Sequence, residues 1–329
     1  MGYTNFPNGI TSMGVPVTGG LGLGPGDVRY VIDAKTTSDL YYTKLLERAI
    51  KDEMIFTALQ TAHDACTSSQ NDIIVMAPQN ESLAAAFTWS KSHIHLVSMS
   101  PLVNAYHPTY ISHTVNTDVL FTISGSYNSF TNIRWLHGYN SATNAHCIEL
   151  TGMGNNFYNC HFEGPEGAAE KAVSGYDLVK VSEEYNFFKN CVFGNTWAAM
   201  TDVSALVGFT GNKNVSTTFE DCLFQKNFGA TSGLFLHTYQ SPNGGSIISF
   251  KNCQFINTGA STPQYAIDGY GMNTNRCIMT FLNCSFNGAT DICAATYEPY
   301  MWFNTGQMHS TAGTDNILNV GLGSNPDAA

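Results

Sequence analysis

The stretch Phe219-Glu220-Asp221-Cys222-Leu223-Phe224 is one of five copies of the hexapeptide Phe-x-(Asn/Asp)-Cys-x-Phe in this 329-residue chain. The cysteines of the five copies stand at positions 160, 191, 222, 253 and 284, so each step along the series is 31 residues. A fixed period of about 20 to 50 residues is typical of a solenoid in which each repeat forms one coil. The spacing therefore predicts a stack of closely similar coils in this part of the chain.

Each hexapeptide is expected to form two short strands joined by a tight bend. Phe and the flanking Val, Ile and Thr residues favour strands over helices. In the copy quoted above, Phe219, Cys222 and Phe224 are expected to point inward, and Asp221 is expected to occupy the bend. Asn and Asp suit such a bend because both tolerate the left-handed backbone conformation and bond to nearby backbone groups.

Stacking these coils at about 4.8 Å places equivalent residues in vertical files. We expect the bend residues to form a polar ladder and the cysteines to be buried free thiols. Thiols that point the same way on in-register parallel strands have poor geometry for disulfides, and a rising column of thiols offers no tetrahedral metal site. The predicted structural ladder consists of Asn159, Asn190, Asp221, Asn252 and Asn283, followed by Cys160, Cys191, Cys222, Cys253 and Cys284.

This pattern resembles the right-handed parallel β-helix of the pectin-lyase-like superfamily, including its asparagine ladder. The resemblance is carried by residues 130–305 and extends to residue 72. It implies an all-β fold in which residues 72–305 form the parallel β-helix. At about 31 residues per coil, a β-helix of this length has about 7–8 coils. The right-handedness comes from the resemblance and from the general preference for right-handed crossovers.

Residues 28–71 are expected to hold an initial strand and capping helices. One helix is predicted to run from Ser38, as its N-cap, to about Ile55. Apolar residues at helical spacing from Phe56 to Cys66 predict a second, amphipathic helix. Because the open end of a solenoid core needs a cover, we expect this second helix to lie over the first coil.

Residues 1–27 are predicted to form an extended N-terminal arm. Gly and Pro recur from Gly14 to Gly26, and this stretch is not expected to form a regular element. The arm nevertheless contains apolar side chains that a solvated linker would not need, so we expect it to dock on a partner. Residues 306–329 are small and polar and are read as a C-terminal tail. The predicted anchoring residues of the arm are Tyr3, Phe6, Ile10, Met13, Val15 and Val17.

Charged residues make up 12% of the chain, and the formal net charge is -11. This balance argues against nucleic acid as a partner, because nucleic-acid binding needs clustered Lys and Arg. No hydrophobic run approaches the length of a membrane span, and the N-terminus lacks the charged-then-apolar pattern of a signal peptide. We therefore expect neither a nucleic-acid nor a membrane partner.

Motifs of the enzymes in the superfamily are incomplete in this chain. Arg134 and Arg276, the arginines of the solenoid, have no acidic residue in their own strands, so neither is read as a lyase base beside a calcium site. Asn116-Thr117-Asp118 and His137-Gly138 match two short motifs of galacturonase-like hydrolases, but the paired aspartates and the Arg-x-Lys motif are absent. We therefore expect no catalytic residues, no cofactor and no metal.

Carboxylate pairs on adjacent coils would indicate glycan hydrolysis. Glu220 is expected to lie between two lysines in an outer charge file, and Asp268 to lie over His237. An acid pair between loops or between subunits stays open. The remaining candidates are Glu163, Glu166 and Glu170, read as a solvated turn, and His93 and His95, read as one polar strand face without a third ligand.

The segment from Tyr3 to Val17 resembles the N-terminal arm of tailed-bacteriophage virion proteins in which such an arm precedes a β-helix. Val28 to Asp33, followed by a capping helix, is similar to the start of that β-helix. The resemblance implies a virion protein, commonly trimeric, of the head-decoration or spike type. The chain has no recognisable receptor-binding or trimerising C-terminal domain, which favours a compact protein seated on the head.

The leading hypothesis is a non-enzymatic capsid decoration or cement protein. Its arm would bind the major capsid protein, it would form a homotrimer, and it would sit on the capsid surface after assembly in the host cytoplasm. The alternatives are a tailspike-type polysaccharide depolymerase and a glycan-binding spike without turnover. In the second alternative the stacking platforms would be Trp197, Tyr300 and Trp302.

Overall fold

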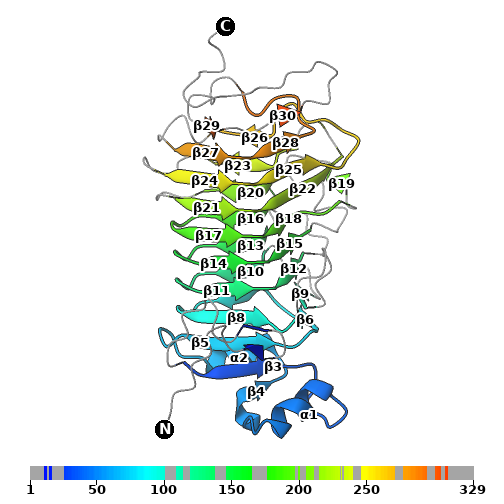
Figure 1. The fold of residues 1–329 in the computed structure, drawn as a ribbon, viewed down its shortest axis with the longest axis vertical. Helices are drawn as coiled ribbons and strands as arrows, with labels where there is room; N and C mark the ends of the chain where they lie inside the picture. The colour runs from blue at the N-terminus through cyan, green and yellow to red at the C-terminus, as the bar shows by residue number, and fades with distance from the viewer. Residues whose placement is uncertain are drawn as a thin grey trace.

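The protein is a right-handed parallel β-solenoid, seen in a computed structural model (Figure 1). Its strands form three long sheets, which we name sheet A (11 strands), sheet B (10 strands) and sheet C (7 strands). The chain passes from sheet C to sheet A to sheet B in each coil. The structure describes residues 11–12, 15–16, 26–100, 109–113, 119–137, 146–164, 176–196, 199–200, 205–210, 215–229, 231, 233–239, 246–270, 277–294, 301–304 and 308–309.

The strands of each sheet stack in parallel along the molecule. Sheet A contains β3 (Val28–Val31), β4 (Ile55–Phe56), β5 (Asp72–Met76), β8 (Ile94–Ser98), β11 (Ser129–Thr131), β14 (Asn156–Tyr158), β17 (Asn186–Lys189), β21 (Thr217–Glu220), β24 (Ile247–Lys251), β27 (Ile278–Leu282) and β29 (Met301–Asn304). Sheet B contains β6 (Asn80–Leu83), β9 (Tyr110–His113), β12 (Arg134–Leu136), β15 (His161–Glu163), β18 (Val192–Phe193), β19 (Ala199–Met200), β22 (Leu223–Phe228), β25 (Gln254–Asn257), β28 (Ser285–Asn287) and β30 (Met308–His309). Sheet C contains β7 (Phe87–Trp89), β10 (Val119–Ile123), β13 (His146–Leu150), β16 (Asp177–Val181), β20 (Ala205–Phe209), β23 (Leu236–Thr238) and β26 (Ile267–Asp268).

The hexapeptide forms the predicted pair of strands around a bend. Phe219 in β21 pairs with Phe188 and Phe250 of the neighbouring coils, and the ring centroids are 4.8 Å apart on both sides. Asp221 adopts φ 55° at the bend, which redirects the chain from sheet A into sheet B. Each stacked aromatic pair adds about 0.5–1.5 kcal/mol beyond burial. Repetition of this term therefore stabilises a narrow core.

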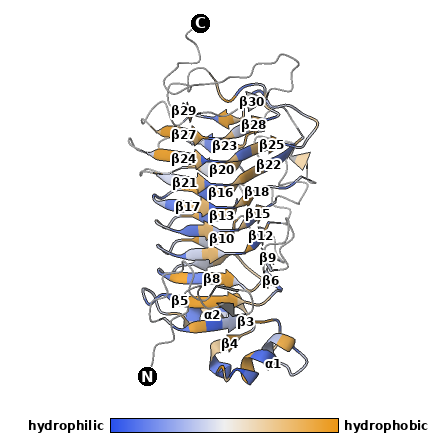
Figure 2. Ribbon diagram, viewed as in Figure 1, coloured by the Kyte–Doolittle hydropathy of each residue, from blue (hydrophilic) through white to orange (hydrophobic). Residues whose placement is uncertain are grey.

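One hydrophobic cluster extends from Val31 to Met301 and includes residues of all three sheets. Figure 2 shows apolar and polar residues alternating along the stacked strands. This alternation is what a strand with one buried and one solvated face requires. The outward face of each sheet is therefore free to carry polar chemistry.

The predicted coil count and the predicted cap both differ from the structure in detail. The strands β3 and β4 extend sheet A below residue 72, where the solenoid was expected to begin. The first helix, α1 (Leu40–Glu47), is shorter than predicted and is capped by Asp39, whose side chain accepts a hydrogen bond from the backbone N–H of Tyr42. It ends because Ala49 adopts φ 57°, the left-handed conformation that terminates many helices.

The second helix, α2 (Leu59–Ala65), covers the end of the core. Leu59, Ala62 and Cys66 belong to the same buried cluster as Phe87 and Trp89. The helix α1 lies further out, beyond the base of the solenoid (Figure 1). The helical cap is therefore made by α2 and not by a long first helix.

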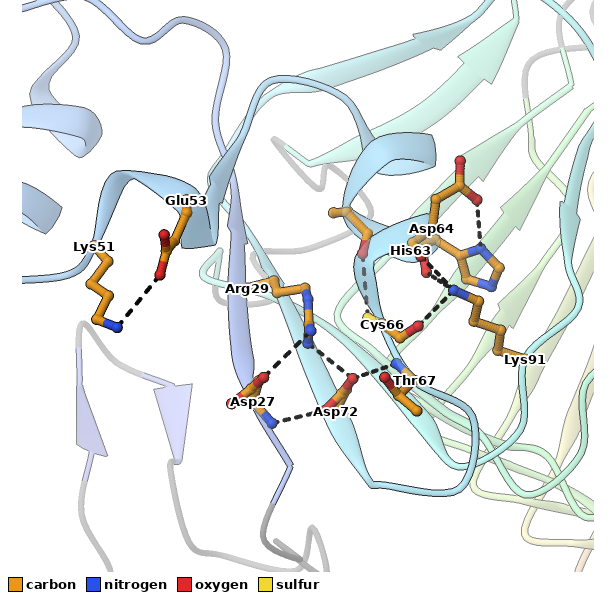
Figure 3. A network of polar contacts seen from close by, with 11 residues as sticks. Asp27, Arg29, Lys51, Glu53, His63, Asp64, Cys66, Thr67, Asp72 and Lys91 are labelled. Carbon is orange, nitrogen blue, oxygen red and sulfur yellow. Dashed lines mark hydrogen bonds and ion pairs between the residues drawn. The ribbon is translucent and has the colours of Figure 1, made fainter.

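A polar network holds α2 on the base of the solenoid (Figure 3). Lys91 Nζ donates to the carbonyl oxygens of His63, Asp64 and Cys66 at 2.9, 2.6 and 2.6 Å. These are orphan acceptors at the end of a helix, where a cation is favoured. Asp72 joins the network by an ion pair of 2.9 Å with Arg29. Lys91 therefore caps the C-terminal end of α2 and ties this helix to the following coil.

The terminal segments differ from expectation at two points. In the predicted arm, β1 (Thr11–Ser12) and β2 (Val15–Pro16) pair in antiparallel fashion, so the expectation of no regular element from Gly14 to Gly26 is wrong at β2. In the predicted tail, β30 adds to sheet B. Among the described residues, no helix is long and apolar enough to span a membrane. The remaining predicted anchoring residues, Tyr3, Phe6, Ile10, Met13 and Val17, lie outside the described residues.

Candidate functional site

The predicted ladder lies at the bend between sheets A and B. Every member, from Asn159 to Asn283, has a positive φ between 51° and 55°. Asn252 Nδ2 donates to Asp221 Oδ1 at 2.9 Å, and Asn283 Nδ2 donates to Asn252 Oδ1 at 3.3 Å. The file is mostly exposed to solvent, and its amide groups bond to one another. The structure therefore gives this file a role in coil stacking and no chemistry.

The five cysteines of the repeat are buried, and all nine cysteines are free. Cys222 Sγ, for example, donates to the backbone oxygen of Phe188 in the preceding coil at 3.5 Å. Burial raises the pKa of the Cys222 thiol well above its ordinary value. A buried thiol with a raised pKa is a poor nucleophile. The file is therefore packing material.

A second ladder, missed in the sequence, runs inside the turn between sheets C and A. Asn128 Nδ2 donates to Asn155 Oδ1 at 3.0 Å, and the backbone N–H of Asn155 donates to Asn186 Oδ1 at 2.9 Å. All three asparagines are at most 1% exposed. These asparagines stand two residues before Phe130, Phe157 and Phe188, a spacing that could have revealed the ladder.

The predicted solvated turn at Glu163 is wrong. Glu163 lies in β15, is 3% exposed, and accepts a hydrogen bond of 2.6 Å from Nε of Arg134 in β12. Arg134 was expected to lack an acidic neighbour because none occurs in its own strand, whereas its partner lies on the next coil. A buried ion pair of this kind is a structural feature. Glu166, Glu170 and Arg276 lie outside the described residues.

The histidine candidates do not form one polar strand face. His93 precedes β8 and has φ 56°, so it does not share a strand face with His95. His95 Nδ1 lies 2.7 Å from Ser129 Oγ. His137 is fully buried and stacks on His113 with ring centroids 4.7 Å apart. None of these residues forms part of a group of three or more metal-ligating side chains in the described part of the chain.

Ionisable side chains gather instead on the outward face of sheet C. Its strands pair so that Glu149, Lys180, Gly208, His237 and Asp268 form one file across five neighbouring strands. The pairing of His237 with Asp268 is the one that the sequence predicted. Successive members lie about 4.8 Å apart. The file therefore brings residues that are up to 119 positions apart in the sequence onto one surface.

Two ion pairs flank the glycine of this file. Lys180 Nζ lies 3.3 Å from Glu149 Oε1, and both side chains are a little over one quarter exposed. His237 Nε2 lies 3.4 Å from Asp268 Oδ2. Two strand spacings, about 10 Å, separate Lys180 from His237. A cationic donor and an imidazole held by a carboxylate therefore face the same stretch of surface.

Asp177, at the start of β16, lies between these two pairs. Its carboxylate sits where a side chain at position 208 would be, since a β-carbon on Gly208 would lie 2.0 Å from Asp177 Oδ2. Asp177 is fully buried. Tyr239, which follows β23, lies beside Asp177 and packs its ring 4.1 Å from that of His237. Asp177 and Tyr239 thus connect the Lys180 pair with the His237 pair.

The electrostatics of this site follow from burial. Burial raises the pKa of Asp177 to about 7, although the Tyr239 hydroxyl, Lys180 and Lys226 oppose the rise. Burial also lowers the pKa of Lys226 to about 7. Lys226 Nζ donates to the carbonyl oxygen of Leu234 at 2.9 Å. Groups whose pKa values are displaced toward neutrality in one place are typical of functional sites.

The chemistry available on this face is proton transfer beside a positive charge. His237 is the accessible acid–base group, and Asp268 holds its Nε2, which leaves Nδ1 directed elsewhere. Lys180 offers a donor to a ligand oxygen that carries or develops negative charge. The sequence did not reveal the centre of this site because the steps to and from Gly208 are 28 and 29 residues, unlike the 31-residue steps at either end.

Comparison with known proteins supports the fold. No protein-family model matches the sequence, and no curated protein matches it. A pectin methylesterase in complex with hexasaccharide VII has a TM-score of 0.57 and 13% identity over 91% of this chain and 92% of that chain. Pectin methylesterase PemA from Erwinia chrysanthemi has a TM-score of 0.57 and 13% identity over 88% of this chain and 91% of that chain. These similarities establish the parallel β-helix fold of this chain.

The expectation that the chain is not an enzyme is corrected by these matches. The two solved structures named above share its fold over about nine-tenths of their length and are pectin methylesterases, which are carbohydrate-active enzymes. At 13% identity the matches assign no activity to this chain. The phage origin stays a prediction: ORF18 of Geobacillus virus E2 has a TM-score of 0.31 and 12% identity over 76% of this chain and 56% of that chain.

Proposed function

We propose that this chain processes a glycan on the outward face of sheet C, and that it does so as a component of a tailed-phage virion. The observation that carries the first part is the connected set of ionisable groups around Gly208. Lys180 with Glu149 lies on one side of the glycine, and His237 with Asp268 lies on the other. Structural ion pairs alone do not need a fully buried carboxyl group between them.

The ligand that fits this face is a sugar with a carboxyl or ester group. Its carboxyl or carbonyl oxygen would accept a hydrogen bond from Lys180, and His237 would take or give the proton. Asp268 would orient the imidazole and stabilise its protonated form. Asp177, which solvent does not reach, would act only on the charge and position of its neighbours. These roles make Lys180 and His237 the catalytic residues and Asp268 and Asp177 positioning residues.

The net charge of the protein further restricts the class of polysaccharide that this face would bind. The formal net charge of -11 disfavours a densely anionic polymer. A glycan whose carboxyl groups are spaced apart or esterified meets less repulsion. We therefore place a sparsely charged or esterified polysaccharide before a fully ionised one.

The virion part of the proposal rests on the sequence resemblance of the segment from Tyr3 to Val17. In this proposal the arm binds the major capsid protein, the solenoid forms a homotrimer, and assembly takes place in the host cytoplasm. A trimer anchored in this way occupies a capsid-decoration position and would carry the glycan-processing face on the surface of the particle. A tailspike-type depolymerase is the second possibility for the same solenoid.

The glycan-processing proposal is tested by incubating the full chain with methyl-esterified pectin, polygalacturonate and purified bacterial capsular polysaccharides. Released methanol, new unsaturated bonds and new reducing ends are measured. Lys180→Met and His237→Gln should each lower the rate on the active substrate by at least tenfold. Asp221→Asn is the matched control, because it restores the amide of the other ladder positions far from sheet C. No product from any substrate would contradict the proposal.

The virion proposal is tested separately by deleting residues 2–26 and purifying particles from a complemented host. We expect the shortened protein to fold, with an unchanged melting temperature, and to be absent from particles. Retention of the shortened protein on particles would rule out the arm as the anchor.

A further inference from the structure

Four consecutive turns that leave sheet C share an unusual backbone conformation. The fourth residue after β7, β10, β13 and β16 has a positive φ in each case: 56° at His93, 59° at Tyr127, 67° at Gly154 and 61° at Tyr185. The turns stack directly, since the N–H of Tyr127 donates to Met153 and the N–H of Gly154 donates to Glu184 in the next coil. These residues therefore form one vertical column at the corner between sheets C and A.

Tyrosine is a costly choice at such a position. The left-handed conformation costs a residue with a β-carbon roughly 1–2 kcal/mol, and bulky residues rarely adopt it. At the six bends from β11–β12 to β27–β28 between sheets A and B the same conformation falls on Asn or Asp, and near the first helices it also falls on Ala49 and Ser69. A residue held in an unfavourable backbone conformation, where another residue type would be less strained, is a reason to look for a function.

The two tyrosines recover little of this cost through burial. Tyr127 is 48% exposed and Tyr185 is 64% exposed. Scattered exposed aromatic residues need no explanation, but these two occupy the same turn position in coils two apart. The column therefore presents two tyrosine side chains to solvent at a separation of roughly 10 Å along the solenoid.

The ring of Tyr127 is also held in place. It stacks on His93 with centroids 5.3 Å apart, and its hydroxyl lies 3.1 Å from Met153 Sδ. It leans over Gly154, where an added β-carbon would lie 2.5 Å from the ring. Gly154 thus leaves room for the ring of Tyr127, and no side chain projects between the two tyrosines. A fixed, exposed ring is preorganised for stacking.

We propose that His93, Tyr127 and Tyr185 form an aromatic subsite that binds the extension of a polysaccharide chain. This inference rests on the proposed function, because the occupant is the glycan that reaches the outward face of sheet C. The subsite is continuous with that face: only three residues separate the end of β16 from Tyr185, and the end of β10 from Tyr127. Sugar rings stack their C–H faces on aromatic rings while their hydroxyl groups stay hydrated.

The spacing indicates how much glycan is bound. Two rings roughly 10 Å apart cannot both stack on one sugar unit. The subsite would therefore add affinity for long oligosaccharides and leave the binding of short ones unchanged. A second copy of this chain is the competing occupant of exposed aromatic residues, and the test separates the two.

The test uses Tyr127→Asn, Tyr185→Asn and the double variant in the full chain. Because Asn suits the left-handed conformation, the melting temperature should stay the same or rise. Binding is measured with a labelled hexasaccharide and a labelled disaccharide prepared from the polysaccharide that the wild type processes. The double variant should bind the hexasaccharide roughly tenfold more weakly and the disaccharide equally. Ile247→Ser, which removes an exposed apolar residue of sheet A, is the control and should change neither.

The outcomes separate the two proposals. If the wild type binds and processes none of the polysaccharides, the proposed function fails and the subsite fails with it. If the wild type processes a polysaccharide and the double variant binds the hexasaccharide as tightly as the wild type, the subsite is wrong and the proposed function stands. A change in molar mass of the double variant by light scattering would instead identify the column as an interface between copies, which also overturns the subsite.

Discussion

The carboxylate of Asp177 occupies the space that a side chain at position 208 would need. A β-carbon added to Gly208 would lie 2.0 Å from Asp177 Oδ2 and 2.3 Å from its Cγ. The glycine admits the buried carboxyl group, and the carboxyl group excludes a larger residue. The interruption of the polar file on sheet C and the buried acid beneath it therefore belong to one arrangement.

Gly208→Ala should destabilise the protein by about 1–3 kcal/mol, because the added methyl group forces the carboxyl group of Asp177 to move. The free energy of unfolding is measured by chemical denaturation. In the Asp177→Ala background the same substitution should cost much less, since the clashing atoms are gone. Equal costs in the two backgrounds would show that the residues do not compete for space.

Asp177 should make stability fall as the pH rises from about 4 to about 7. Its ordinary pKa is 3.8 and its pKa in the folded protein is about 7, so the folded state prefers the protonated acid. The stabilising contribution is complete below the ordinary pKa and is lost as the pH rises through the folded pKa. The free energy of unfolding of the wild type minus that of Asp177→Asn should therefore decrease over this range. A difference that does not change with pH would contradict the raised pKa.

His113 should have the opposite effect in acid. Burial, with a smaller effect of His137, lowers its pKa from 6.5 to about 4, so its contribution to stability is present above pH 6.5 and is lost as the pH falls through 4. His113→Phe keeps an aromatic ring against His137 and removes the titration. Between pH 6.5 and 5 the wild type should lose about 1–2 kcal/mol more than this variant. If the free energy of unfolding of the two proteins changed equally with pH, the result would contradict this prediction.

The ladder position 221 separates backbone conformation from hydrogen bonding. Asp221→Ala should cost about 2 kcal/mol, the sum of an unfavourable φ and a lost hydrogen bond to Asn252. Asp221→Gly relieves the backbone term and should cost less. Asp221→Asn should be close to neutral. Urea denaturation of the three variants checks the order, and an Ala variant as stable as the Asn variant would show that the ladder adds nothing.

The inward files could be predicted from the sequence because the bend and its two strands have a constant length. With a constant length, every inward residue recurs at 31 positions, and Asp221 takes its place among the asparagines. The same regularity predicted the outer file in which Glu220 lies 3.1 Å from Lys189 and 3.6 Å from Lys251. Packing and local backbone preference act together at these positions.

The outward face of sheet C could be predicted only in part, because loops of different length precede its strands. Lys180 follows Glu149, and Asp268 follows His237, by the repeat period, whereas Gly208 falls out of step. The partner of Arg134 was missed for the same reason, since Glu163 lies 29 positions away. In the cap, Ser38 was the expected N-cap, but its hydroxyl bonds Thr36 and Asp39 caps the helix. Contacts between coils decide the first two cases, whereas the local hydrogen bond from Tyr42 to Asp39 decides the third.

The most direct test of the glycan-processing face is a crystal structure of the His237→Gln variant with a bound oligosaccharide from the polysaccharide that the wild type processes. The account predicts a sugar on the outward face of sheet C, with an oxygen within hydrogen-bonding distance of Lys180 Nζ and the reacting group next to residue 237. An oligosaccharide bound on sheet A or sheet B, with the Lys180 and residue 237 side chains left in solvent, would contradict it.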